Sequence, residues 1–196
     1  MSPGKVVRKG LATAVAVVSA TVLSGCIGAM DRADFDAEMA RRGGGLTTEL
    51  VGDVLAALRV HYRVSEDTDV GLTSLTLQAE GALVGVEAQA PDDPRVLDSY
   101  TFEDGELSAP TPVRVSAMDD VEARVFRPGD VPALGGIEDI VDTAVREAGI
   151  EDGLVSRIAV QRSAGDVVVV AAVESPRTLA TVLFDAEGGF DEVVPQ

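Results

Sequence analysis

The chain has 196 residues, and its 33 acidic side chains outnumber its 16 lysines and arginines, so the formal net charge at pH 7 is −17. Proteins bind the phosphate backbone of nucleic acids through clustered lysine and arginine, so this composition excludes nucleic acid as a partner. The chain has one cysteine and one histidine, which excludes a disulfide and leaves too few ligands for a zinc site.

The first 25 residues are predicted to be a signal peptide. Lys5, Arg8 and Lys9 form a basic segment, and an apolar run over residues 11–23 follows it. This run is shorter than the roughly 20 residues that a membrane-spanning helix needs, and no other stretch is long and apolar enough. We therefore expect a cleaved signal and no transmembrane helix.

The sequence Leu23-Ser24-Gly25-Cys26 resembles a bacterial lipobox, in which the cysteine receives diacylglycerol before the signal peptide is cut off. The resemblance implies a mature protein that begins at lipidated Cys26, with palmitate-type chains in the extracytoplasmic face of the cell membrane. Each buried acyl methylene contributes roughly 0.8 kcal/mol, so two or three chains anchor a protein firmly. The alternative is an ordinary secretory signal followed by an incidental free cysteine.

Residues 26–45 are expected to form a tether, because they are largely small and polar and end in three glycines, Gly43 to Gly45, which disfavour regular structure. All 33 acids but only 13 arginines lie after Gly25, so the mature net charge is 13 − 33 = −20. This charge favours solubility. A cation or a basic partner is the alternative, but the acidic clusters at residues 66–69, 92–93 and 119–120 lack calcium-loop spacing and are expected to be turns.

A helix and three strands are predicted after the tether. Apolar residues recur at helical spacing from Leu46 to Leu58, with Thr47 or Thr48 as the N-cap. Residues 72–79, 82–88 and 96–102 have the alternation of strands. Glu80-Gly81 and Asp104-Gly105 are hairpin turn signals between and after them.

The second half repeats this order. Apolar residues from Ile137 to Val145 predict a helix, and residues 155–161, 167–173 and 178–184 predict strands, with a turn at 164–166. The segment from Val121 to Phe126 is expected to be a linking strand between the halves.

The two halves also share residues at a nearly constant offset. The offset is 82 for the third strand of each unit and the two residues before it, and 83 for the first strand, and a one-residue difference in the loops explains the change. The fold class is therefore predicted as α+β, with two tandem αβββ units at residues 46–117 and 118–196; chance similarity in a Val- and Ala-rich chain is the alternative. The matched pairs are Pro94 and Pro176, Arg95 and Arg177, Leu97 and Leu179, Phe102 and Phe184, Leu75 and Ile158, Leu77 and Val160, and Gln78 and Gln161.

The helix-then-strands order, with "VDTAVREAG" at 141–149 and "LFDAEGGF" at 183–190, resembles PepSY-like modules, in which a helix precedes an antiparallel sheet. A tandem pair of such units is also similar to the beta-lactamase-inhibitor-protein architecture. The resemblance implies an envelope module that binds or inhibits through its sheet.

Catalytic signatures are missing from the sequence. There is no G-x-S-x-G, no P-loop and no H-E-x-x-H, and His61 has no partner at a recognisable spacing, so we expect a non-enzyme without cofactor or metal. His61, Phe102 and Phe184 are expected to be core or core-edge residues. Arg95 and Arg177, each after a proline that opens a strand, either pair with neighbouring acids or present two symmetric donors to an anionic ligand.

Together these observations predict a lipid-anchored lipoprotein that acts as a binding or assembly accessory for another envelope protein. The alternative is a carrier of a lipid or other small apolar ligand, in which the run from Val167 to Val170 would line an internal cavity. That run is also typical of a fully buried strand.

Overall fold

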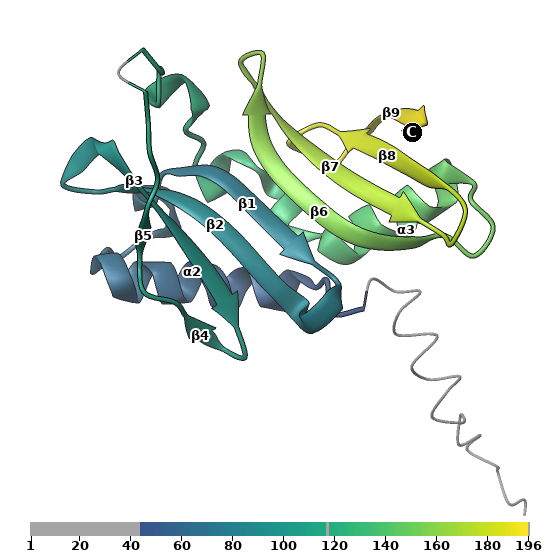
Figure 1. Cartoon of the computed structure of the whole chain (residues 1–196), viewed down its shortest axis with the longest axis horizontal. Coiled ribbons are helices and arrows are strands. Elements are labelled where there is room, and N and C mark those ends of the chain that lie inside the picture. Colours follow the sequence, from purple (N-terminus) through teal and green to yellow (C-terminus); the bar gives the residue numbers. More distant parts are fainter. Residues whose placement is uncertain (1–43, 117, 196) are drawn as a thin grey trace, which may run out of the picture. The chain divides into compact units, whose positions relative to one another are not determined.

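The computed structural model of the protein describes residues 44–116 and 118–195. The expected signal peptide, the lipobox with Cys26 and most of the tether lie outside the described residues. The described part is mixed α+β, with two α-helices and one antiparallel sheet of nine strands, and it forms one compact unit. Both helices lie on the same face of this sheet (Figure 1).

Helix α2 spans Thr48–Tyr62 and follows the predicted amphipathic pattern. The Thr47 hydroxyl accepts a hydrogen bond from the Leu50 N–H at 3.1 Å, which confirms Thr47 as the N-cap. The helix ends at Arg63, which adopts a left-handed conformation with φ of 56°. The buried stripe consists of Val51, Val54, Leu55 and Leu58.

Helix α3 spans Ile137–Ala148 and ends at Gly149, whose φ of 61° suits glycine. Its buried stripe packs against β6, β7 and β8. The preceding residue, Gly136, has no side chain that could cap the helix. Instead, the Ile137 N–H donates to the hydroxyl of Thr48 in the first turn of α2, at 3.1 Å, so the two helix N-termini meet.

The sheet has the strand order β4-β3-β2-β1-β6-β7-β8-β9, with β5 paired to β3 (Figure 1). Every pairing is antiparallel, and β1 and β6 form the centre. The bounds are β1 Leu72–Gln78, β2 Leu83–Ala90, β3 Asp93–Glu103, β4 Glu106–Leu107, β5 Thr111–Pro112, β6 Leu154–Ser163, β7 Asp166–Glu174, β8 Leu179–Phe184 and β9 Phe190–Pro195.

All six strands predicted in the two halves are confirmed within a few residues. The second and third predicted strands of each half pair with each other in the same way. Phe102 pairs with Val84, and Phe184 pairs with Val169. At the centre, β1 and β6 pair around Thr76 and Ala159, so the sheet runs without a break through both predicted units. The order of strands is thus the same from either end toward the centre.

One predicted element is wrong. The segment from Val121 to Phe126 is not a strand, because Glu122–Arg124 forms a 3-10 turn and only Phe126 makes an isolated bridge, to Leu72. Three consecutive polar or small residues cannot present an alternating apolar face. The structure also adds strands that the sequence pattern did not indicate, namely β9 and the short β4 and β5.

The core lies between the helices and the sheet. Phe102 and Phe184 are 4% and 1% exposed, which confirms them as core residues. Val167 and Val169 are buried in the same core, whereas Val168 and Val170 alternate to the other face and are only half-buried. The valine-rich run is therefore a core strand packed by α3.

Candidate functional site

The two arginines singled out in the sequence do not form one site. Arg95 Nε lies 3.1 Å from Asp93 Oδ1, and hydrogen bonds from Arg95 lower the pKa of Asp93. Arg177 is exposed beyond the end of β7. Strands β3 and β8 are separated by β2, β1, β6 and β7, so at about 4.8 Å per step these residues lie roughly 24 Å apart across the sheet.

His61 belongs to an aromatic cluster at the end of α2. The Tyr100 hydroxyl lies 3.2 Å from His61 Nε2 and 3.0 Å from the Tyr62 hydroxyl, and the three rings meet edge to face. Burial, together with the hydrogen bond to Tyr100, raises the pKa of Tyr62 well above its ordinary value. This cluster fixes the end of the helix on β3, which is a packing role at the core edge.

The more distinctive feature is the sheet face opposite the helices, which we call the open face. Its central row follows from the register and crosses five strands through Gly85, Thr76, Ala159, Val170 and Leu183. These residues are small or aliphatic, uncharged and half-buried. Among the described residues, no helix lies over β1, β6, β7 and β8 on this side (Figure 1).

A groove of about 1250 Å³ runs from this row to one end of the sheet. We call it the Arg157 groove, because Arg157 lies on its floor at the centre of the lining strands. Gly44 and Gly45 border the groove, so the chain leaves the predicted tether beside it. The groove is lined by strand residues that include Thr76, Gln78, Arg157, Ala172, Glu174 and Thr181.

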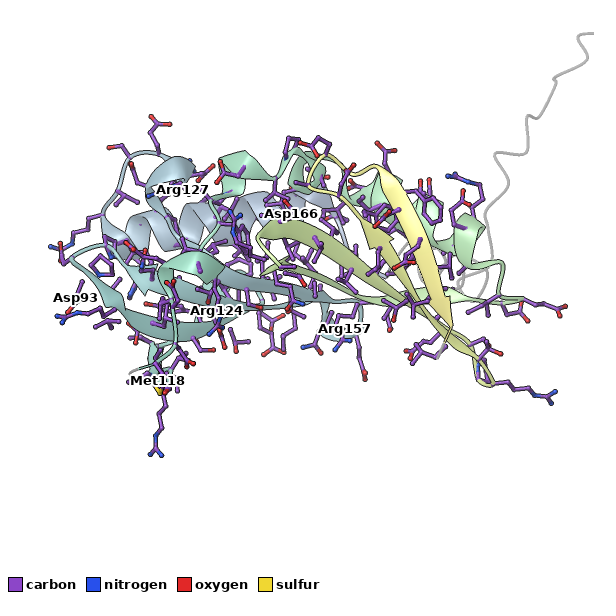
Figure 2. The ribbon with its side chains drawn as sticks, turned by 90° about the horizontal axis from the view of Figure 1, so that it is seen from above. Asp93, Met118, Arg124, Arg127, Arg157 and Asp166 are labelled. Carbon is purple, nitrogen blue, oxygen red and sulfur yellow. The ribbon has the colours of Figure 1, made fainter. Side chains whose placement is uncertain are left out.

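Arg157 is placed by strand pairing. It lies opposite Gln78 on β1 and opposite Ala172 on β7, and its side chain extends away from the helix layer (Figure 2). Arg157 is exposed, and within residues 44–116 and 118–195 its guanidinium has neither an ion pair nor a hydrogen bond. The small side chain of Ala172 leaves the guanidinium open to the groove.

The carboxylates of the groove all lie at its outer end. Glu174 is two residues beyond Ala172 on β7, and Glu80 is two residues beyond Gln78, just after β1. Asp152 precedes β6 at the same end. The groove thus has a cation and an amide toward the middle of the sheet and three anions at its mouth.

The groove can recognise ligands by charge and hydrogen bonding. In the described part of the chain, no three His, Cys, Asp or Glu residues are grouped so that they could hold a metal ion.

Sequence reasoning missed Arg157 and Gln78, because they are 79 positions apart and meet only through the β1–β6 pairing. The alternation along residues 154–163 was the one available signal, since it places Arg157 opposite the core residues of β6.

No protein-family model and no curated protein matches the chain. Among solved structures, a chain from Clostridium difficile 630 described as a "putative lipoprotein" is similar, with a TM-score of 0.51 and 10% sequence identity. The alignment covers 74% of this chain and 91% of that chain. At this identity the likeness shows a shared fold. No helix among the described residues is long and apolar enough to cross a membrane.

Proposed function

We propose that this chain is an extracytoplasmic lipoprotein, anchored through acylated Cys26, that acts as a non-catalytic binding or assembly accessory module of the cell envelope. The observation that carries the proposal is the helix-free open face with its groove. The central row of this face is small or aliphatic and uncharged, and uncovered apolar surface rimmed by polar residues is typical of an interaction site. We expect its partner to be another envelope protein.

The anchor is supported by the lipobox-like residues and by the fold shared with the Clostridium difficile chain. Gly44 is 44 − 26 = 18 residues beyond Cys26, so the folded module can reach at most roughly 65 Å from the lipid surface. Replacing Cys26 by alanine and fractionating cells tests the anchor. We expect the variant to leave the membrane fraction, and unchanged retention would refute lipid anchoring.

The tandem-unit interpretation supports a composite binding surface. The sequence-matched residues Leu97 and Leu179 occupy equivalent places in the strand pairing of their halves. Leu97 lies opposite Gln89, and Leu179 lies opposite Glu174. Leu97 is 1% exposed and Leu179 is 41% exposed, so the first half is covered at this position and the second half is not. We propose that the halves arose as αβββ units, and that the second half, left uncovered, supplies most of the binding face.

Site-specific photocrosslinking tests the binding face. A crosslinking residue at Leu183 on the open face should capture an envelope protein in intact cells. The same residue at Asp142, exposed on α3, is the matched control and should capture little. Capture from Asp142 with none from Leu183 would place the interface on the helix layer and refute the proposal.

The carrier alternative has less support. The valines expected to line a cavity, Val167 and Val169, pack within the core, and the groove is open rather than enclosed. Native mass spectrometry of protein purified from its own envelope separates the two functions. A co-purifying small apolar molecule would favour the carrier, and a co-purifying protein favours the accessory.

A further inference from the structure

We propose that the Arg157 groove binds a short, extended peptide by its free ends, with the carboxylate on Arg157 and the ammonium among the carboxylates at the mouth. This inference rests on the proposed binding function and names a ligand class for part of the open face. It starts from the position of Arg157, an exposed arginine without a partner among the described residues, on a floor of small side chains.

The floor favours a carboxylate at Arg157. A guanidinium presents a planar fork of N–H donors that matches a carboxylate in two parallel hydrogen bonds. Gln78 lies directly across the β1–β6 pair and adds an amide N–H₂ donor on the same face. Thr76 and Thr181 are half-buried lining residues whose hydroxyls supply further hydrogen-bonding groups around the same point.

The mouth favours a cation. Glu80, Asp152 and Glu174 surround the outer end of the groove, and for each of the three no ion pair is found in the described part of the chain. A ligand that is only anionic is repelled by the three carboxylates at the outer end of the groove. A ligand that is only cationic meets Arg157 at the floor. A zwitterion whose two charges are separated along the groove satisfies both ends.

The separation between the two ends sets the length of the ligand. Glu174 is two residues from Ala172, the strand partner of Arg157, and each strand residue advances about 3.3 Å, so the backbone positions that carry the two groups lie roughly 7 Å apart along the strand. The mouth carboxylates reach outward from there. An extended peptide of about three residues spans this distance between its terminal charges.

The test uses the lipidated full-length mature protein in detergent and trialanine as the probe. Calorimetric titration should detect binding of free-ended trialanine, and N-acetylation or C-amidation should each weaken binding at least tenfold. Arg157→Gln should weaken binding at least tenfold, and Glu174→Gln should weaken it severalfold. Arg95→Gln is the matched control, because Arg95 is also exposed but lies far across the sheet, and it should leave binding unchanged.

Each contrary outcome overturns the inference. These outcomes are no binding of trialanine at millimolar concentration, equal binding of the doubly capped peptide, or an equal loss in the Arg95 and Arg157 variants. Arg157→Lys guards against a folding artefact. It keeps the positive charge but not the planar set of guanidinium N–H donors, so it should give a loss of affinity smaller than that of Arg157→Gln. Crosslinking from Leu183 is measured independently, so a failed peptide titration with positive crosslinks would reject the ligand class and leave the accessory function standing.

Discussion

Glu138 should stabilise the fold more than any other exposed acid of α3, because it joins two helix N-termini. Its carboxylate accepts the Thr48 N–H at 2.9 Å and the Thr48 hydroxyl at 2.5 Å, and that hydroxyl also accepts the Ile137 N–H. The first turns of α2 and α3 therefore share one negative charge. Both turns carry the partial positive charge of a helix N-terminus, which the carboxylate offsets.

The contribution of Glu138 to the free energy of unfolding follows from these contacts. Each helix terminus gains about 0.3 to 1 kcal/mol from a nearby anion, and hydrogen bonds to a charged group are worth more than neutral ones. Glu138 is largely exposed, so solvent screening reduces the sum. Glu138→Gln keeps the shape and removes the charge, and we expect it to lower the free energy of unfolding by about 1 to 2 kcal/mol at pH 7.

The same contacts give the effect a pH dependence. Burial alone would raise the pKa of Glu138, but the hydrogen bonds from Thr48 outweigh it and the net pKa is lowered. A carboxyl with a depressed folded-state pKa contributes stability above its unfolded pKa of about 4.3 and loses it as the pH falls through the folded-state value. The gap between wild type and Glu138→Gln should therefore be constant near neutrality, shrink as the pH falls below the unfolded pKa, and close once the pH is below the lowered folded-state pKa.

Urea unfolding of the mature chain, with Cys26→Ser to prevent acylation, measures this gap at several pH values. Asp142→Asn is the matched control, because Asp142 is an exposed acid one turn further along α3, and it should change stability by less than about 0.5 kcal/mol. A neutral effect of Glu138→Gln at pH 7, or a gap that does not shrink as the pH is lowered from neutrality into the acid range, would refute the role of the shared charge.

Three further predictions test the core, a turn and the aromatic cluster. Phe102→Ala and Phe184→Ala should each cost about 3 to 5 kcal/mol in urea unfolding, and a loss under 1 kcal/mol for either would contradict its core position. Ala164 has φ of 52° in the tight turn between β6 and β7, so Ala164→Asn should raise Tm by a few degrees, and a lower Tm would contradict the strain. Burial raises the pKa of both Tyr62 and Tyr100, the two tyrosines of the chain, so an absorbance titration of the native protein should show little phenolate at pH 10; half-ionisation there would speak against the cluster.

The sequence allowed the helices and the longer strands to be predicted, because their burial patterns are periodic. In β1, Leu75 and Leu77 alternate with polar residues, and α2 repeats its apolar residues every three or four positions. The edge strand β9 was missed because its apolar residues are interrupted by two acids, Asp191 and Glu192, and its strand geometry depends on pairing with β8. An edge strand of this kind is defined by its neighbour more than by its own sequence.

The binding groove was harder to predict, for a geometric reason. Matching the halves pairs Arg95 with Arg177, but the antiparallel pairing at the centre places β3 and β8 on opposite sides of the sheet, so these two residues lie far apart. Gln78 and Arg157 are not equivalent in the two halves, and the same pairing brings them together. At the centre, Thr76 and Ala159 are equivalent at the offset of 83 and lie directly opposite each other, whereas the positions on either side of them pair with non-equivalent residues.

The distribution of charge also favours the open face as the place where a partner binds. Strands β1 and β8 carry no charged residue, and β6 carries no acid and presents Arg157 on the open face, whereas its second arginine, Arg162, alternates to the other face and donates a hydrogen bond to the Val125 carbonyl. Helix α3, in contrast, carries four acids and one arginine. A negatively charged partner or an anionic lipid surface is repelled by the helix layer and not by the centre of the sheet. The acidic composition that excludes nucleic acid thus coexists with a sheet centre that is neutral to basic, while the groove that starts there carries its three carboxylates at the outer end.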